Sequence, residues 1–204
     1  MSGFYPFNPN LGQVMQTGIE GVTVDRAFDA HFQISAANAT AADTDGIHTA
    51  VTDTGAQQVI STGITQPSVP RNITATAGGT AADIKAVQVI IAGTNYADEA
   101  ITETLPAFTA DTAGTVTGSK AFKTVTSITI PAHDGTGATT AIGFGEKLGL
   151  PFKLAHNTVD KAYLNNVLEG TAPTVATSTT AFESNTVDLN SALNGTVVDV
   201  YLKA

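Results

Sequence analysis

The stretch of sequence that decides the fold is KAFKTVTSITI, residues 120–130. Apolar and polar side chains alternate along it, and Pro131 follows directly and ends the run. Alternation with a period of two is typical of a strand with one buried face. We therefore expect a single strand over residues 120–130. One face would have Phe122, Thr124, Thr126, Ile128 and Ile130, and Val125 would lie on the other.

Shorter segments of the same character lie on both sides of this run. In residues 28–34, Phe28, Ala30, Phe32 and Ile34 alternate with Asp29, His31 and Gln33, which predicts a half-buried strand. Further strands are expected at 57–61, 71–76, 86–92, 99–105, 139–144 and 196–203. Residues 35–56 are small, polar and rich in turn formers, which favours a long loop or weakly formed strands.

Turn residues predict how some of these strands connect. The sequence GTNYAD, residues 93–98, would close a hairpin between 86–92 and 99–105. Residues 159–169 are compatible with a short helix, but Asn165-Asn166 is a good type I′ pair, so we favour a second hairpin there. Asn194-Gly195 would turn the chain into its final strand.

Composition agrees with these local patterns. The 204 residues include 33 Thr and 19 Gly, and only 13% of them are charged, about half the usual share. Thr suits a pleated surface and Gly suits turns. We expect an all-β fold, an antiparallel sandwich or barrel with little helix. It would follow an extended N-terminal arm (1–27) as one β-rich domain (28–204), with two packed modules (28–150 and 151–204) as the alternative.

The expected arm contains the candidate interaction residues. Phe4, Tyr5 and Phe7 cluster around Pro6 and Pro9. Proline favours extended backbone, and three aromatic side chains in four positions favour burial against a partner surface. We therefore expect the arm to dock on its own domain or on a neighbouring subunit.

Motifs that carry chemistry fail at specific positions. The four His residues (31, 48, 133 and 156) lack metal-ligand spacing, the chain has no Cys, and Asp43 to Gly46 is better explained as an acidic turn than as a calcium loop. Asp98, Glu99 and Glu103 are conceivable glycosidase carboxylates, but the chain has no Trp and only four Tyr for sugar platforms. We expect no enzyme activity, no catalytic residue, no cofactor and no metal.

The formal net charge is −9, from 9 Lys and Arg against 18 Asp and Glu. Such a charge repels phosphate backbones and anionic lipid surfaces. We therefore expect neither nucleic acid nor membrane as a partner.

Two long runs resemble a module of structural proteins of tailed bacteriophages. They are QPSVPRNITATAGGTAADIKAVQVIIAGTNYADEAITETLP, which begins at residue 66, and GSKAFKTVTSITIPAHDGTGATTAIGFGEKLGLP, which ends at residue 151; the ending NTVDLNSALNGTVVDVYLKA is similar in character. The resemblance covers over half the chain and implies a virion protein of head or tail, without catalytic residues.

Within that group we favour a capsid decoration or cement protein, because acidity suits a location away from packaged DNA. Its partners would be the major capsid protein and copies of itself in a homo-oligomer. Its location would be the virion, which is assembled in the cytoplasm of the bacterial host. The alternatives are a tail tube or baseplate-associated protein and a non-viral surface binding module.

Overall fold

The computed structural model describes residues 15–16, 23–24 and 29–203. Nearly all of their regular structure is β, and every strand pair is antiparallel, which confirms the expected fold class. The helical segments in this part of the chain are two three-residue 3-10 turns, η1 (Ala81–Asp83) and η2 (Phe182–Ser184). None of the helices described is long and apolar enough to cross a membrane. Before the main body, β1 (Met15–Gln16) pairs with β2 (Thr23–Val24).

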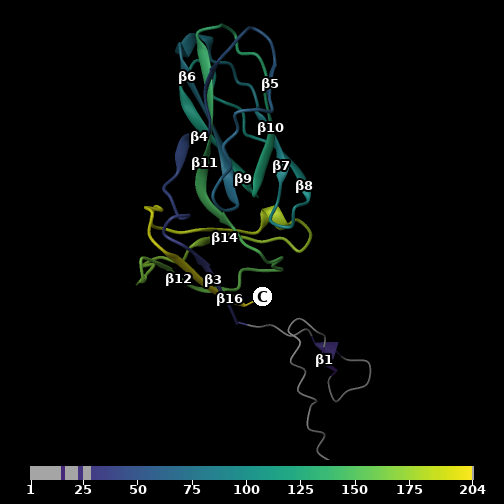
Figure 1. Cartoon of the computed structure of the whole chain (residues 1–204), viewed down its shortest axis with the longest axis vertical. Coiled ribbons are helices and arrows are strands. Elements are labelled where there is room, and N and C mark those ends of the chain that lie inside the picture. The colour runs from purple at the N-terminus through teal and green to yellow at the C-terminus, as the bar shows by residue number, and fades with distance from the viewer. Residues whose placement is uncertain (1–14, 17–22, 25–28, 204) are drawn as a thin grey trace, which may run out of the picture.

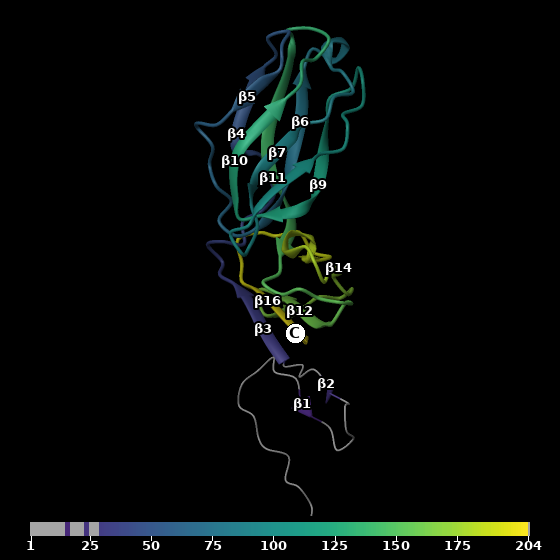
Figure 2. The same ribbon diagram turned by 90° about the vertical axis from the view of Figure 1, so that its right-hand side faces the viewer.

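The largest unit is a sandwich of eight strands, β4 to β11, at one end of the elongated body (Figures 1 and 2). One sheet has the order β4 (Asp43–Thr52), β11 (Ala138–Gly149), β6 (Arg71–Gly79) and β9 (Gly114–Phe122). The facing sheet has the order β5 (Gln58–Ile60), β10 (Thr124–Ile130), β7 (Ile90–Thr94) and β8 (Ala100–Thr104).

This strand order is that of a jelly roll. Counted along the chain from β4, one sheet has strands one, eight, three and six, and the other has two, seven, four and five. The first strand pairs with the eighth, the second with the seventh, the third with the sixth and the fourth with the fifth, and successive pairs lie in alternate sheets. This is the double Greek-key arrangement of jelly rolls. The sequence analysis left sandwich and barrel open, and this unit is a two-sheet sandwich.

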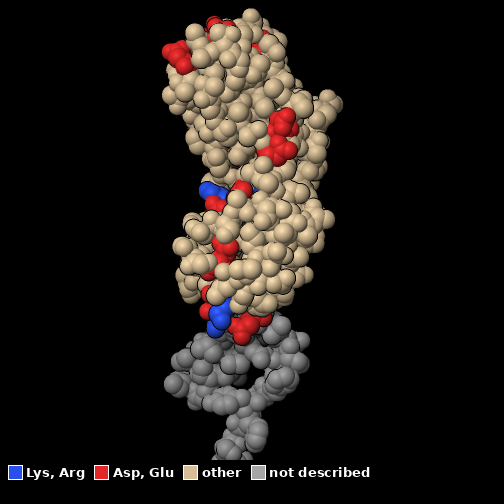
Figure 3. Space-filling view, turned by 90° about the vertical axis from the view of Figure 1, so that its left-hand side faces the viewer, with Lys and Arg blue, Asp and Glu red and all other residues tan. Residues whose placement is uncertain are grey.

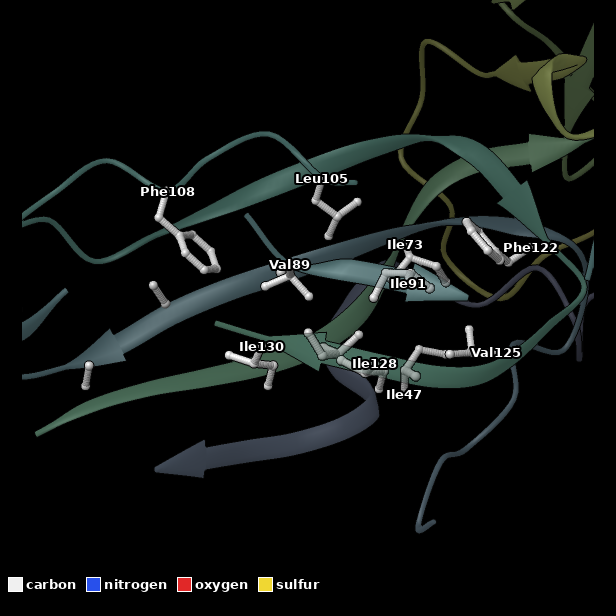
Figure 4. Close-up of a cluster of buried hydrophobic side chains, with 14 of the residues drawn as sticks. Ile47, Ile73, Val89, Ile91, Leu105, Phe108, Phe122, Val125, Ile128 and Ile130 are labelled. Atoms are coloured by element: carbon white, nitrogen blue, oxygen red, sulfur yellow. The ribbon is translucent and has the colours of Figure 1, made fainter. Parts of the chain in front are cut away.

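The inner faces of the two sheets enclose the first hydrophobic core (Figure 4). Ile73 and Ile142 come from one sheet, and Ile91 and Ile128 come from the other; all four are fully buried. Full burial of a side chain of this size contributes about 1.5–3 kcal/mol. Alternating apolar positions thus hold the sandwich together, while Thr occupies many outward positions.

The expectation of one strand over 120–130 is wrong. β9 ends at Phe122 and β10 begins at Thr124, so the chain passes from one sheet to the other at Lys123. The register also shifts between Val125 and Ser127. Because of the crossing and the shift, Phe122, Val125 and Ile128 all point into the same core, although simple alternation places Val125 on the opposite face.

Two turn predictions are confirmed. β12 (Val159–Leu164) and β13 (Val167–Leu168) form a hairpin, and its turn residues Asn165 and Asn166 have φ of 52° and 62°. Positive φ at both central positions is what a type I′ turn requires. The hairpin of β7 and β8 is also present, and the Asn95 side chain accepts hydrogen bonds from the backbone N–H groups of Ala97 and Glu99 in its turn.

Residues 43–52 are more regular than their sequence suggested. The expected acidic turn, Asp43 to Gly46, is instead the start of the ten-residue β4. β4 pairs with an edge of β11, with two register shifts. Gly143 makes this approach possible, since a Cβ there would collide with the carbonyl oxygen of Asp43. Pairing with β11 thus holds the turn-like residues Asp43 to Gly46 in a strand.

A second β unit lies below the sandwich in Figure 1. Its sheet has the order β13, β12, β16 (Val198–Lys203) and β3 (Asp29–Ile34), and it packs near a hairpin of β14 (Thr174–Ala176) and β15 (Thr186–Asp188). The core of this unit is a second cluster of buried residues, which includes Ile34, Leu148, Leu164, Val187, Val198, Val200 and Leu202. The second core thus combines residues from 29–39 with residues from 148 onward. The division of the chain at residue 150 stays a prediction.

Three features join the two units. β11 pairs with β4 and β6 in the sandwich, and its last residues, Leu148 and Gly149, pair with β15. Arg71 is fully buried at the junction of the two units. Its Nη1 donates a hydrogen bond to the carbonyl oxygen of Thr40 at 2.8 Å, and its guanidinium lies 4.6 Å from the centre of the Phe144 ring. Burial lowers the pKa of Arg71 to about 10, so it stays protonated at neutral pH.

The third contact is polar. Glu183, in η2, accepts a hydrogen bond from the Asn95 amide at 3.3 Å, and its carboxylate lies 3.5 Å from the Lys120 ammonium. Asn95 and Lys120 belong to the sandwich, so this contact fixes the second unit against it.

Candidate interaction site

The outward side of the second unit's sheet has the most distinctive group of side chains in the described part of the chain. Val198, Val200 and Leu202 of β16 point into the core, so Asp199, Tyr201 and Lys203 point outward. In the register, Tyr201 lies opposite His31 of β3 and Lys161 of β12, and Asp199 lies opposite Gln33 and Tyr163. We call the outward side of β3, β12 and β16, with His31, Tyr163 and Tyr201, the aromatic face.

Three rings form the centre of the aromatic face. The rings of His31 and Tyr201 stack, with centres 4.6 Å apart and planes 4° from parallel. Tyr163 meets Tyr201 edge to face, with centres 5.9 Å apart. Such pairs are worth about 0.5–1.5 kcal/mol each beyond the area that they bury. Tyr201 nevertheless stays 42% exposed, so one aromatic surface remains open.

A buried carboxylate fixes the orientation of the cluster. Asp199 is 7% exposed, and its Oδ1 accepts hydrogen bonds from His31 Nε2 and Gln33 Nε2, both at 2.7 Å. An ionised carboxylate only accepts, so Nε2 of His31 carries a proton. The His31 ring is therefore held in place and supports Tyr201 from the side of β3.

The aromatic face is hollowed. A pocket of about 540 Å³ lies on it, lined by Asp29, Ala30, His31, Asp160, Lys161, Tyr163, Tyr201, Leu202 and Lys203. Lys203 and Asp29 form an exposed ion pair at 3.7 Å on its rim. Figure 3 shows positive and negative side chains together at the lower end of the described body. An aromatic floor with a charged rim offers stacking and hydrogen-bonding contacts.

A second polar cluster lies in the sandwich and has a structural role. His133 is 6% exposed; its backbone N–H donates to Asp53 at 3.1 Å, its Nδ1 accepts from the backbone N–H of Lys85, and its Nε2 lies 3.0 Å from the Thr140 hydroxyl. Burial lowers the pKa of His133, although the nearby Asp53 and Asp134 raise it. These bonds tie the turn after β10 to the start of β11.

Within residues 29–203, no three His, Cys, Asp or Glu side chains are grouped so that they could hold a metal ion. The expected interaction residues Phe4, Tyr5 and Phe7 lie outside the described residues, so their role stays a prediction. Sequence reasoning placed His31 on the polar side of its strand, and the structure agrees. It missed Tyr163 and Tyr201. Alternation in TVVDVYLK does put Tyr201 on the outward side, but nothing in the sequence pairs that strand with residues 29–34.

Comparison of the chain with protein families, with curated proteins and with solved structures found no match.

Proposed function

We propose that the protein is a structural subunit of a tailed-bacteriophage particle, and specifically a decoration or cement protein on the outside of the capsid. The observation that carries this proposal is the eight-stranded jelly-roll order of β4 to β11. Jelly rolls are used repeatedly in viral capsid proteins. Because one fold serves many functions, the jelly roll supports this proposal by analogy.

The way the two units are joined supports a mechanical role. β11 continues from the sandwich into the second unit, and both Arg71 and Glu183 make contacts at the junction. A body joined in this way resists bending between its two ends. A cement protein needs this property, because it stabilises a particle by holding contacts at a fixed spacing.

Charge favours an exterior position. The net charge of −9 repels packaged DNA, so the outer surface of a shell is a better location than its lumen. The partners proposed here are the major capsid protein and further copies of this chain, in a virion assembled in the bacterial cytoplasm. Symmetric shells repeat each contact many times, so even a weak one contributes to particle stability.

The test compares particles with and without the gene for this protein. Purified wild-type heads should contain the protein in a fixed ratio to the major capsid protein. Heads from the deletion strain should lack it, should lose their DNA at a lower temperature, and should regain heat resistance when recombinant protein is added back. A matched control is recombinant protein with Phe122→Ala, whose sandwich is destabilised.

Two outcomes would contradict the proposal. If the protein is found with purified tails and not with heads, it is a tail tube or baseplate component. If it is absent from purified particles altogether, a binding module outside the virion becomes the better explanation, with the aromatic face as its binding surface.

A further inference from the structure

We propose that the aromatic face binds the N-terminal segment, residues 1–14, of a second copy of the chain. The inference deepens the proposed function and rests on it, because it names the contact that would join neighbouring copies on a particle. The contact is a property of the chain itself, so we also expect it between purified molecules at high concentration.

The receiving surface lies on the open side of its sheet. The other side of its sheet is covered by the second core, whereas on this side Tyr201 is 42% exposed beside a hollow of about 540 Å³. Leu168 follows on from Tyr163 in the register and is 52% exposed. Open aromatic and aliphatic side chains gathered on one face are typical of a protein interface.

The N-terminal segment is rich in aromatic side chains and has no charged ones. Its sequence, MSGFYPFNPNLGQV, contains Phe4, Tyr5 and Phe7, and the chain has no charged side chain before Glu20. Docking therefore buries no ionised side chain of the segment. Pro6 and Pro9 restrict the backbone toward an extended form, which lowers the entropy lost on binding. Proline-containing extended peptides with apolar side chains commonly bind grooves lined by aromatic residues.

The first residue of β3 lies at the hollow. β3 begins at Asp29, which itself lines the hollow, and it is an edge strand whose outer side has no partner among the described strands. The chain enters β3 at the end of the body that lies away from the sandwich (Figures 1 and 2). Because β1 pairs with β2, Met15 lies beside Val24, so only residues 8–14 and 25–28 add reach, up to about 40 Å at about 3.3–3.6 Å for each residue. A segment attached at this end therefore reaches the hollow of a neighbouring copy that lies within this distance of Asp29.

The experiment uses the full-length protein with a photoreactive benzophenone amino acid in place of Tyr5. Two preparations, one with natural nitrogen and one with ¹⁵N, are mixed in equal amounts at high concentration and irradiated. Mass spectrometry then identifies the attached peptide and the isotope of each half. We expect crosslinks to peptides that contain His31, Tyr163 or Tyr201. About half of them should join a light chain to a heavy one, as random pairing of separate molecules requires.

Two variants distinguish binding at the aromatic face from non-specific crosslinking. Tyr163→Ser combined with Tyr201→Ser should reduce mixed-isotope crosslinks by roughly tenfold or more, since stacking and apolar burial are both lost. Val59→Ser is the matched control, because Val59 is 62% exposed on the distant β5, and it should leave the yield unchanged. Thermal unfolding confirms that each variant is folded.

Crosslinks within one isotope only would mean that the segment binds its own chain, and the proposal would be overturned. Crosslinks elsewhere, no crosslinks, or a yield that the Tyr double variant does not lower would overturn it as well. These failures differ from failure of the proposed function. A protein that is present on heads but gives no mixed crosslink is still a decoration protein, and one that gives them but is absent from particles is not.

Discussion

Replacing Phe122 with Ala tests the packing of the sandwich at the point where the chain changes sheets. Phe122 is fully buried, and its ring packs over Gly93, where an added Cβ would lie 3.0 Å from Phe122 Cδ1. Collapse around the vacated space is resisted, because Phe122 is paired with Arg71 and the next residue, Lys123, donates a backbone hydrogen bond to Thr94 at 2.8 Å. Phe-to-Ala changes in such sites cost about 3–5 kcal/mol, so we expect a loss of about 4 kcal/mol in the free energy of unfolding.

Urea unfolding followed by far-ultraviolet circular dichroism measures this loss. Since small domains are stable by only about 5–15 kcal/mol, Phe122→Leu is measured in parallel in case the Ala variant does not fold, and we expect it to lose about 1–2 kcal/mol. Val59→Ala, on an exposed site, should stay within about 0.5 kcal/mol of the wild type. A loss below about 1 kcal/mol for Phe122→Ala would refute a fixed core position for this ring, and with it the change of sheet at Lys123.

The remaining predictions concern a buried carboxylate, a buried histidine and a turn. Glu103 is 8% exposed and accepts hydrogen bonds from the backbone N–H and the hydroxyl of Ser119 at 2.7 and 2.9 Å. Glu103→Gln should lower the free energy of unfolding by about 1–3 kcal/mol. An unchanged midpoint of urea unfolding would show that this contact is not formed. Because burial lowers the pKa of His133 from its usual 6.5, the unfolded chain takes up the proton at a higher pH than the folded chain does. The free energy of unfolding should therefore fall as the pH drops below about 6.5, and it should fall less steeply in His133→Gln. Equal slopes of the free energy of unfolding against pH in the two proteins would contradict this. At φ of 62°, Asn166→Gly should raise the free energy of unfolding slightly and Asn166→Ala should lower it by about 1 kcal/mol, as measured by thermal unfolding. The opposite order would argue against the type I′ turn.

The local sequence predicted strands and turns correctly where pairing with neighbouring strands did not decide the structure. Alternation predicted the strand ending at Ile34 and the final strand, because each has one face on a core and one face outward. The Asn165-Asn166 pair predicted its turn, because few residues accept positive φ at two successive positions.

Prediction failed where pairing partners decide the structure. Alternation could not reveal the change of sheet at Lys123, since both strands on either side of it are locally regular. β4 begins with residues typical of a turn, Asp43 to Gly46, and these are held in a strand by pairing with β11. The aromatic face was missed for a similar reason, because His31 and Tyr201 are far apart in the chain and become neighbours only through the register of β3 and β16.

The most direct test of the central proposal is a cryo-electron microscopy map of intact heads from the wild type and from the strain that lacks this gene. The proposal predicts a difference density on the outer surface of the capsid, at every symmetry-related position. That density should fit the jelly-roll sandwich together with the second β unit as one elongated body. Identical head maps from the two strains, or a difference confined to the tail, would contradict it.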